Sequence, residues 1–233
     1  MSAVAEPSLV PKGRPSKAFF TVGAVGCIIN TIVAMWFLLD AYVSVFRREP
    51  FWIIGYVLLI IGLSLASVGY LGTRRNYGSG AGTASFAIAI VVSILFLLWT
   101  LWRITDYPFF HDYYEEYWLL RSYVLVIIYE LFFVMMILWG VTHVTTRRFT
   151  GNSGLSLATG IMLILAAVFV NVWTTLWFVD TLWWYHGYHE FVLWRIVDVF
   201  DLVWTSLFFV SEILATILFF MAKVPESSAK SVT

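Results

Sequence analysis

Residues 84–104 read ASFAIAIVVSILFLLWTLWRI, and Arg103, close to the end, is the only charged side chain among them. The hydrocarbon core of a bilayer is about 30 Å thick, and a helix needs roughly 20 apolar residues to cross it. A run of this length with a single charge near one end is typical of a membrane-spanning helix. The stretch therefore predicts a transmembrane segment.

Five further runs of the same kind lie on either side of this one. They span about 18–42, 51–71, 119–143, 155–179 and 193–222. Of the 233 residues, 61% are hydrophobic and 12% are charged, whereas charged residues make up about a quarter of a soluble domain. All six prolines lie in the tails or at segment borders, so no predicted helix is broken. We therefore expect an all-α integral membrane protein, with a six-helix bundle over 18–222 and polar tails at 1–17 and 223–233.

The charge balance and the single cysteine narrow the class of protein further. Lys and Arg together number 14, as do Asp and Glu, so the net charge gives no reason to expect a nucleic acid partner. Cys27 is the only cysteine, which rules out an intrachain disulfide and any zinc or iron–sulfur motif built from cysteines. The predicted partners are the lipid bilayer and either a second copy of the chain or a larger membrane complex.

The distribution of basic residues predicts the orientation of the bundle, because cytoplasmic loops hold the excess of Lys and Arg. One side collects nine of them: Lys12, Arg14, Lys17, Arg74, Arg75, Arg147, Arg148, Lys223 and Lys230. That side carries only two carboxylates, Glu6 and Glu226, whereas the other side and the membrane interior carry twelve. We therefore expect both termini in the cytoplasm and the bundle in the plasma membrane.

A shift of the chain by 73 to 75 residues aligns two segments that contain the second to fifth spans. The shift places Thr73-Arg74-Arg75 on Thr146-Arg147-Arg148, Gly78 on Gly151, Trp99-Thr100 on Trp173-Thr174 and Asp106 on Asp180. The pattern predicts a parallel internal repeat of a helical hairpin, helices 2–3 and 4–5, each with a glycine-rich turn at 78–82 or 151–154. The alternative is coincidence, since inner loops often carry Arg pairs and outer interfaces often carry Trp.

The last span carries three carboxylates on one face. Asp198, Asp201 and Glu212 are spaced i, i+3 and i+14, which places them within about 60° of one another around a helix. A charged side chain at the bilayer centre costs at least about 2.5–3.5 kcal/mol on insertion scales, so this face must meet protein or water. At 1.5 Å per residue, Glu212 lies about 25 Å inward from Arg195, near or below the membrane midplane.

Three other polar residues lie inside the predicted spans. Glu130 is about 13 Å inward from Arg121, and Asn171 and Asn30 also lie well inside their helices. A descending series of such groups can carry protons or a small cation. The candidate ion path consists of Glu130, Glu212, Asp198, Asp201 and Asn171.

Each of these carboxylates also has a purely structural interpretation. Asp198 and Asp201 are within reach of arginines at the outer ends of the helices, which favours simple ion pairs for these two residues. Glu130 and Glu212 have no basic residue at matching depth, which favours a functional role. A neutral Glu can nevertheless serve only to hydrogen-bond a neighbouring helix.

The two predicted outer loops contain histidines and carboxylates, which are ligands for zinc, copper or non-haem iron. The candidate metal ligands are His111, His186, His189, Asp106 and Asp180. The repeat brings both loops to one level, so we expect the three histidines to form one cluster. No established ligand spacing is present, and a hydrated rim of polar residues is the competing interpretation. The positions of the histidines argue against a haem.

Small residues form a ladder along the second predicted span. They are Gly55, Gly62, Ala66 and Gly69. Small residues at this spacing let two helix backbones approach closely within a membrane, so the ladder predicts a face packed against another helix.

Three functions are compatible with these features. The first is movement of protons or a small cation through the buried carboxylates, with the acidic outer side as a funnel. The alternative is a membrane-anchoring subunit of a larger respiratory or oxygenase-like complex. The third is an enzyme with a metal site on its outer face. The sequence favours the first and leaves the ion, the substrate and the partner subunits open.

Overall fold

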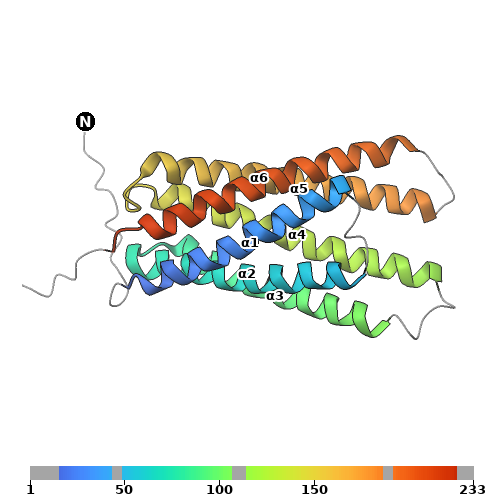
Figure 1. Ribbon diagram of the computed structural model, residues 1–233, viewed down its shortest axis with the longest axis horizontal. Helices are drawn as coiled ribbons and strands as arrows, with labels where there is room; N and C mark the ends of the chain where they lie inside the picture. Colours follow the sequence, from blue (N-terminus) through green and yellow to red (C-terminus); the bar gives the residue numbers. More distant parts are fainter. Residues whose placement is uncertain (1–15, 44–48, 107–113, 186–190, 225–233) are drawn as a thin grey trace, which may run out of the picture.

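The computed structural model describes residues 16–43, 49–106, 114–185 and 191–224, and these contain six helices (Figure 1). The helices are α1 (Ala18–Val43), α2 (Glu49–Tyr77), α3 (Gly80–Asp106), α4 (Tyr114–Thr146), α5 (Ser153–Tyr185) and α6 (Phe191–Met221). Each contains a stretch long and apolar enough to cross a membrane, the shortest being 22 residues in α1. The predicted all-helical fold with six membrane-length helices is confirmed.

The helices are longer than hydropathy alone predicts. The spans expected at 84–104 and 155–179 become Gly80–Asp106 and Ser153–Tyr185. The expected turn at 78–82 is therefore wrong beyond residue 79, and the one at 151–154 is wrong beyond residue 152. Hydropathy marks the part of a helix that lies in hydrocarbon, whereas the backbone hydrogen bonds continue into the polar interface.

Two tight turns join α2 to α3 and α4 to α5. Gly78 and Gly151 have φ angles of 73° and 81°, in the left-handed region that glycine enters without steric cost. The residue after each glycine caps the next helix. Ser79 Oγ and Asn152 Oδ1 each accept from the backbone N–H three residues later, at 3.3 Å and 3.0 Å. Both turns thus follow one design, 73 residues apart.

The contacts between helices form a closed ring in chain order. Each helix contacts the next one along the chain, and α1 contacts α6, which closes the ring. α2 and α4 also touch across the centre. The outside of the ring carries exposed aliphatic side chains such as Ile28, Leu98, Ile127 and Val199. Such a surface is covered by lipid in a membrane protein.

Both described ends of the chain lie beside the C-terminal end of α2. The backbone N–H of Ser16 donates to Asn76 Oδ1 at 2.9 Å, and the hydroxyl of Tyr77 donates to the carbonyl of Lys223 at 2.8 Å. The α2–α3 and α4–α5 turns lie at this same end, on the left in Figure 1. We call it the inner end and the opposite one the outer end. That the inner end faces the cytoplasm stays a prediction from the charges.

The contact between α1 and α2 is close because small residues line it. A Cβ added to Gly23 would lie 2.5 Å from the Cα of Gly69, and one added to Gly26 would collide with the backbone of Ala66. The ladder residues that lie against α1 are Gly55, Gly62, Ala66 and Gly69. Close backbone approach of this kind holds helices together where lipid gives no hydrophobic driving force.

Candidate functional site

Glu212 lies in the interior of the bundle, on α6, and is only 1% exposed. Asn30 of α1 is fully buried and donates from Nδ2 to Glu212 Oε2 at 3.4 Å. Cys27, one turn earlier on α1, is buried beside this carboxylate, close enough for its thiol to interact with it. Gly62 of α2 leaves the space that the Asn30 amide occupies, because a Cβ there would collide with Asn30 Oδ1. A carboxylate, an amide and a thiol therefore meet inside an apolar core.

A second buried polar pair, the inner polar pair, consists of Tyr70 on α2 and His143 on α4. The Tyr70 hydroxyl and His143 Nε2 are 3.0 Å apart, and both residues are buried. Tyr70 stacks on Trp139 with ring centroids 4.5 Å apart, and Phe219 of α6 contacts both members of the pair. Tyr70 is also close enough to Glu212 to interact with its charge. The pair thus lies on the inner side of the Glu212 site.

The chain spacing of this pair recurs at the outer end. Tyr70 and His143 are 73 residues apart, and so are Tyr56 and Tyr129, the outer tyrosine pair, whose hydroxyls are 3.3 Å apart. The same shift aligns the two arginine-pair turns in the sequence. Hydropathy and charge do not select these four residues, because Tyr and neutral His fit within an apolar run. The sequence analysis missed them, and the 73-residue shift is the signal that could have paired them.

Glu130 belongs to a different interface from Glu212. Its two carboxylate oxygens accept from Asn171 Nδ2 at 3.0 Å and 2.8 Å, between α4 and α5. Both residues are half-buried, so this pair lies nearer the lipid-facing surface. Glu130 and Glu212 each have an amide partner on a neighbouring helix, but the structure assigns them to separate contacts.

The acidic face of α6 becomes more buried from the outer end inward. Asp198 is exposed, Asp201 is half-buried and Glu212 is buried. Asp201 Oδ1 accepts from the indole N–H of Trp204 at 2.8 Å. Its charge also acts on the outer tyrosine pair. This face is therefore exposed at its outer end and packed in the interior at Glu212, and its expected contact with water stays a prediction.

Aromatic rings separate Asp201 from Glu212 along α6. Phe132 of α4 contacts Phe96 of α3 and both Trp204 and Phe208 of α6, with ring centroids 5.7–6.3 Å apart. A cavity of about 10 Å³ lies among these rings, close to the smallest volume that holds one water molecule. We call these four residues the aromatic layer. It is packed and apolar.

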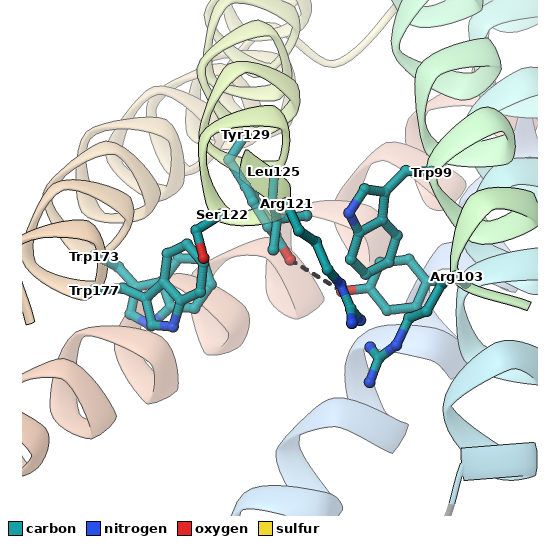
Figure 2. Close-up of a pocket in the computed structure, with 9 residues that line it drawn as sticks. Trp99, Arg103, Arg121, Ser122, Leu125, Tyr129, Trp173 and Trp177 are labelled. Carbon is teal, nitrogen blue, oxygen red and sulfur yellow. Dashed lines mark hydrogen bonds between the residues drawn. The ribbon is translucent and has the colours of Figure 1, made fainter. Parts of the chain in front are cut away.

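A pocket of about 320 Å³, the outer pocket, lies at the outer end of the bundle (Figure 2). Its lining residues are Tyr56, Trp99, Arg103, Arg121, Ser122, Leu125, Tyr129, Trp173 and Trp177. The guanidinium carbons of Arg103 and Arg121 each lie 5.7 Å from the centroid of the Trp99 ring. In the sequence analysis, Arg121 served only to mark the outer end of its helix, and Arg103 was given no role. Their meeting depends on how α3 and α4 are rotated about their axes, which spacing along the chain does not give.

The predicted metal ligands fall mostly outside the described residues. This holds for His111, His186 and His189, while of Asp106 only the backbone is described, as the last residue of α3. Asp180 is buried near the outer end of α5, with 8% exposure. Among the described residues, no group of three His, Cys, Asp or Glu is placed to hold a metal. The outer-face metal site and the expected histidine cluster stay predictions.

Six membrane-length helices around a mostly apolar core with a few buried polar groups indicate a multi-pass integral membrane protein. Comparison with protein-family models, with curated proteins and with solved structures found no match. The buried polar groups and the outer pocket are therefore the evidence on function.

Proposed function

We propose that this membrane protein moves protons across the bilayer and that Glu212 is the central proton carrier. The supporting observation is the burial of this carboxylate, 1% exposed, beside Asn30 and Cys27. Neither an amide nor a thiol offers the positive charge that would compensate a purely structural buried carboxylate. Ionisable groups inside membrane helices are costly and mark ion or proton pathways.

The chemistry of Asn30 suits a partner that gains and loses a proton. Its Nδ2 donates to Glu212, whereas its Oδ1 has no hydrogen-bond donor among the described residues. The amide nitrogen and oxygen exchange places when the side chain flips, and the oxygen then accepts from a protonated carboxyl group. One amide thus serves both the charged and the neutral form of Glu212.

Polar groups on both sides of Glu212 support a path through the interior. Toward the inner end, Tyr70 lies within range of the Glu212 charge and is hydrogen-bonded to His143. Toward the outer end lie Asp201, then the exposed Asp198. The aromatic layer stands between the two halves, and apolar constrictions of this kind gate by excluding water. We therefore propose that protons pass only when this layer opens to water.

The surroundings of Glu212 favour a proton over a metal cation. Hard cations take about six or more oxygen ligands, whereas the partners of Glu212 are one amide and one thiol. A proton needs only successive donors and acceptors.

Glu130 is a second candidate carrier within the same proposal. It is half-buried and both of its oxygens are held by Asn171. A carboxylate held at both oxygens near the bundle surface is less free to pass a proton inward. We therefore assign it a smaller share of the flux than Glu212.

Proton flux into liposomes that contain the full-length protein tests this function. A K⁺ diffusion potential set with valinomycin drives protons inward, and a trapped pH-sensitive dye reports their entry. We expect Glu212→Gln to lower the flux by about tenfold or more, because Gln keeps the hydrogen bond to Asn30 but carries no exchangeable proton of this kind. Glu130→Gln should lower it less. Ser211→Ala, a change at the adjacent and equally buried residue, should leave the flux at the wild-type level.

Two results contradict the proposal. One is a wild-type protein without proton flux, and the other is wild-type flux in both Gln variants. The membrane-anchoring subunit of a larger respiratory or oxygenase-like complex then becomes the better reading, and a partner protein retained on purification from native membranes would support it.

We also propose that the α2–α3 and α4–α5 hairpins are two copies of one unit in the same orientation. The left-handed glycines Gly78 and Gly151, the caps that follow them and the two contacts between residues 73 apart support it. Two copies related by a rotation about the bundle axis place equivalent residues face to face at that axis. Matched substitutions in the two turns should then have equal effects on stability.

A further inference from the structure

The outer pocket combines positive charge with aromatic walls, which proton movement does not require. The buried members of its lining are Tyr56, Trp99, Ser122 and Tyr129. Arg103 and Arg121 also line the pocket and are partly exposed. The volume of about 320 Å³ lies in the range of small-molecule sites.

The pocket has a cationic side and an apolar side. Arg103 comes from α3 and Arg121 from α4, and both guanidinium groups are held near the ring of Trp99. Figure 2 shows the two arginines on one side and Trp173 and Trp177 on the other. These two indoles stack with centroids 6.3 Å apart and planes 20° from parallel. Two positively charged side chains that line one pocket favour an anion in it.

We propose that the outer pocket binds an oxyanion, a carboxylate or a phosphate, that is carried on an apolar or flat body. Guanidinium groups bind such oxyanions through paired charge-assisted hydrogen bonds. The stacked indoles of Trp173 and Trp177 provide apolar surface for the rest of the ligand.

The depth of the pocket allows two sources for this ligand. Arg103 lies in the last turn of α3, and Arg121 lies about two turns after the start of α4, at the outer ends of their membrane spans. Lipid headgroups and water meet at this level. The oxyanion is therefore either the headgroup of an anionic phospholipid or a soluble organic anion.

Asp201 supplies an internal check on the sign of the charge effect. The lining residue Tyr56 interacts with the charges of Arg103, Arg121 and Asp201. A bound anion is attracted by the two arginines and repelled by the carboxylate. Loss of an arginine should weaken anion binding, whereas Asp201→Asn should strengthen it. If the two arginines serve only to pair with Asp201, the Asp201→Asn variant should not bind the anion more tightly than the wild type does.

Quenching of tryptophan fluorescence by 4-bromobenzoate tests the proposal, because Trp99, Trp173 and Trp177 line the pocket. The full-length protein is placed in phosphatidylcholine nanodiscs. We expect saturable quenching by 4-bromobenzoate and none by the neutral 4-bromobenzamide. Arg103→Gln and Arg121→Gln should each raise the half-saturating concentration about tenfold or more, as expected for the loss of one charge-assisted hydrogen bond.

Two matched variants separate this site from other effects. Arg195→Gln removes the same charge from an exposed residue of α6 that does not line the pocket, and it should bind as the wild type does. Glu212→Gln should also bind as the wild type does, so the binding site and the proton function succeed or fail separately. Arg103→Lys keeps the positive charge, and Asp201→Asn should bind the anion more tightly. These two variants still test the proposal if a Gln variant does not fold.

Equal quenching by the acid and the amide would overturn the proposal, as would wild-type binding in both arginine Gln variants. The source of the ligand is identified by purification from membranes that contain phosphatidylglycerol. Retention of this lipid by the wild type and its loss in Arg121→Gln identifies a headgroup. If the wild type and Arg121→Gln retain equal amounts of this lipid, while the wild type still binds 4-bromobenzoate, the ligand is a soluble anion.

Discussion

The inner and outer halves of the bundle use the same two helices, α2 and α4, in different ways. In the inner half, Tyr70 and His143 are surrounded by the rings of Trp139 and Phe219. In the outer half, the outer tyrosine pair lines a pocket of about 320 Å³. The contacting residues are 73 apart in both halves. The register of α2 against α4 is therefore constant, and side-chain size and charge decide whether a layer is packed or open.

The neighbouring helix α1 contributes to the same contrast. Gly23 meets the backbone of Gly69 in the inner half, so α1 and α2 are in direct backbone contact there. For Gly55 in the outer half, the Phe37 ring is the only group of the described residues within 4 Å of an added Cβ, at 3.5 Å. The α1–α2 contact therefore has no room for an additional methyl group at Gly23, its tight end, whereas it has room for one at Gly55, its loose end.

The largest contrast is expected between Gly23→Ala and Gly55→Ala. The Gly23 variant pushes a methyl group into the backbone of Gly69, so it should lower the free energy of unfolding by about 1–3 kcal/mol or more. Gly55→Ala places a better helix former in ordinary contact and should raise stability by up to about 1 kcal/mol. Unfolding by denaturant in one detergent, followed by circular dichroism, measures both. A greater loss of stability in Gly55→Ala than in Gly23→Ala would contradict the conclusion that α1 and α2 pack more tightly in the inner half than in the outer half.

A smaller contrast is expected between Tyr70→Phe and Tyr56→Phe. Loss of the Tyr70 hydroxyl leaves the buried Nε2 of His143 without its partner, which should cost about 1–3 kcal/mol. Loss of the Tyr56 hydroxyl breaks a longer bond of 3.3 Å beside the outer pocket, where water can replace it, and should cost less than about 1 kcal/mol. The same unfolding measurement decides. Equal losses of stability would show that water is excluded to the same extent around Tyr70 and around Tyr56.

The smallest contrast is expected within the inner end, between Gly78→Ala and Gly151→Ala. Each puts a Cβ on a residue with φ near +75° or +80°, so each should cost about 1–2 kcal/mol. Because the two turns share one design, the two costs should agree within about 0.5 kcal/mol. Thermal unfolding of the two variants side by side measures the difference. A large difference would argue against two copies of one hairpin.

The number and approximate positions of the helices were predictable, because a bilayer requires about 20 apolar residues per span and the sequence contains six such runs. The helix ends were less predictable. Ser79 and Asn152 start α3 and α5 earlier than hydropathy suggests, since a capping side chain satisfies the first N–H groups whatever the apolarity of the next residues.

The position of the site residues along their helices was predictable, but the residues that they face on other helices were not. A rise of 1.5 Å per residue predicts that Glu212 lies far inside its helical span, and Asn30 was recognised as a polar residue inside its span. That Asn30 and Glu212 hydrogen-bond required the pairing of α1 with α6, which is a property of the ring. The outer pocket draws side chains from four helices, and spacing within one helix cannot show which faces of four helices meet.

The closed ring also means that the order of the helices along the chain is not needed for their packing. Ser16 and Lys223 bond to the consecutive residues Asn76 and Tyr77, so a short linker can join the two ends of the membrane domain. New ends opened at Gly151, in the α4–α5 turn, also lie at the inner end. A circularly permuted chain of this kind keeps an even number of crossings, and it differs from the natural chain only in which helix pair enters the membrane first.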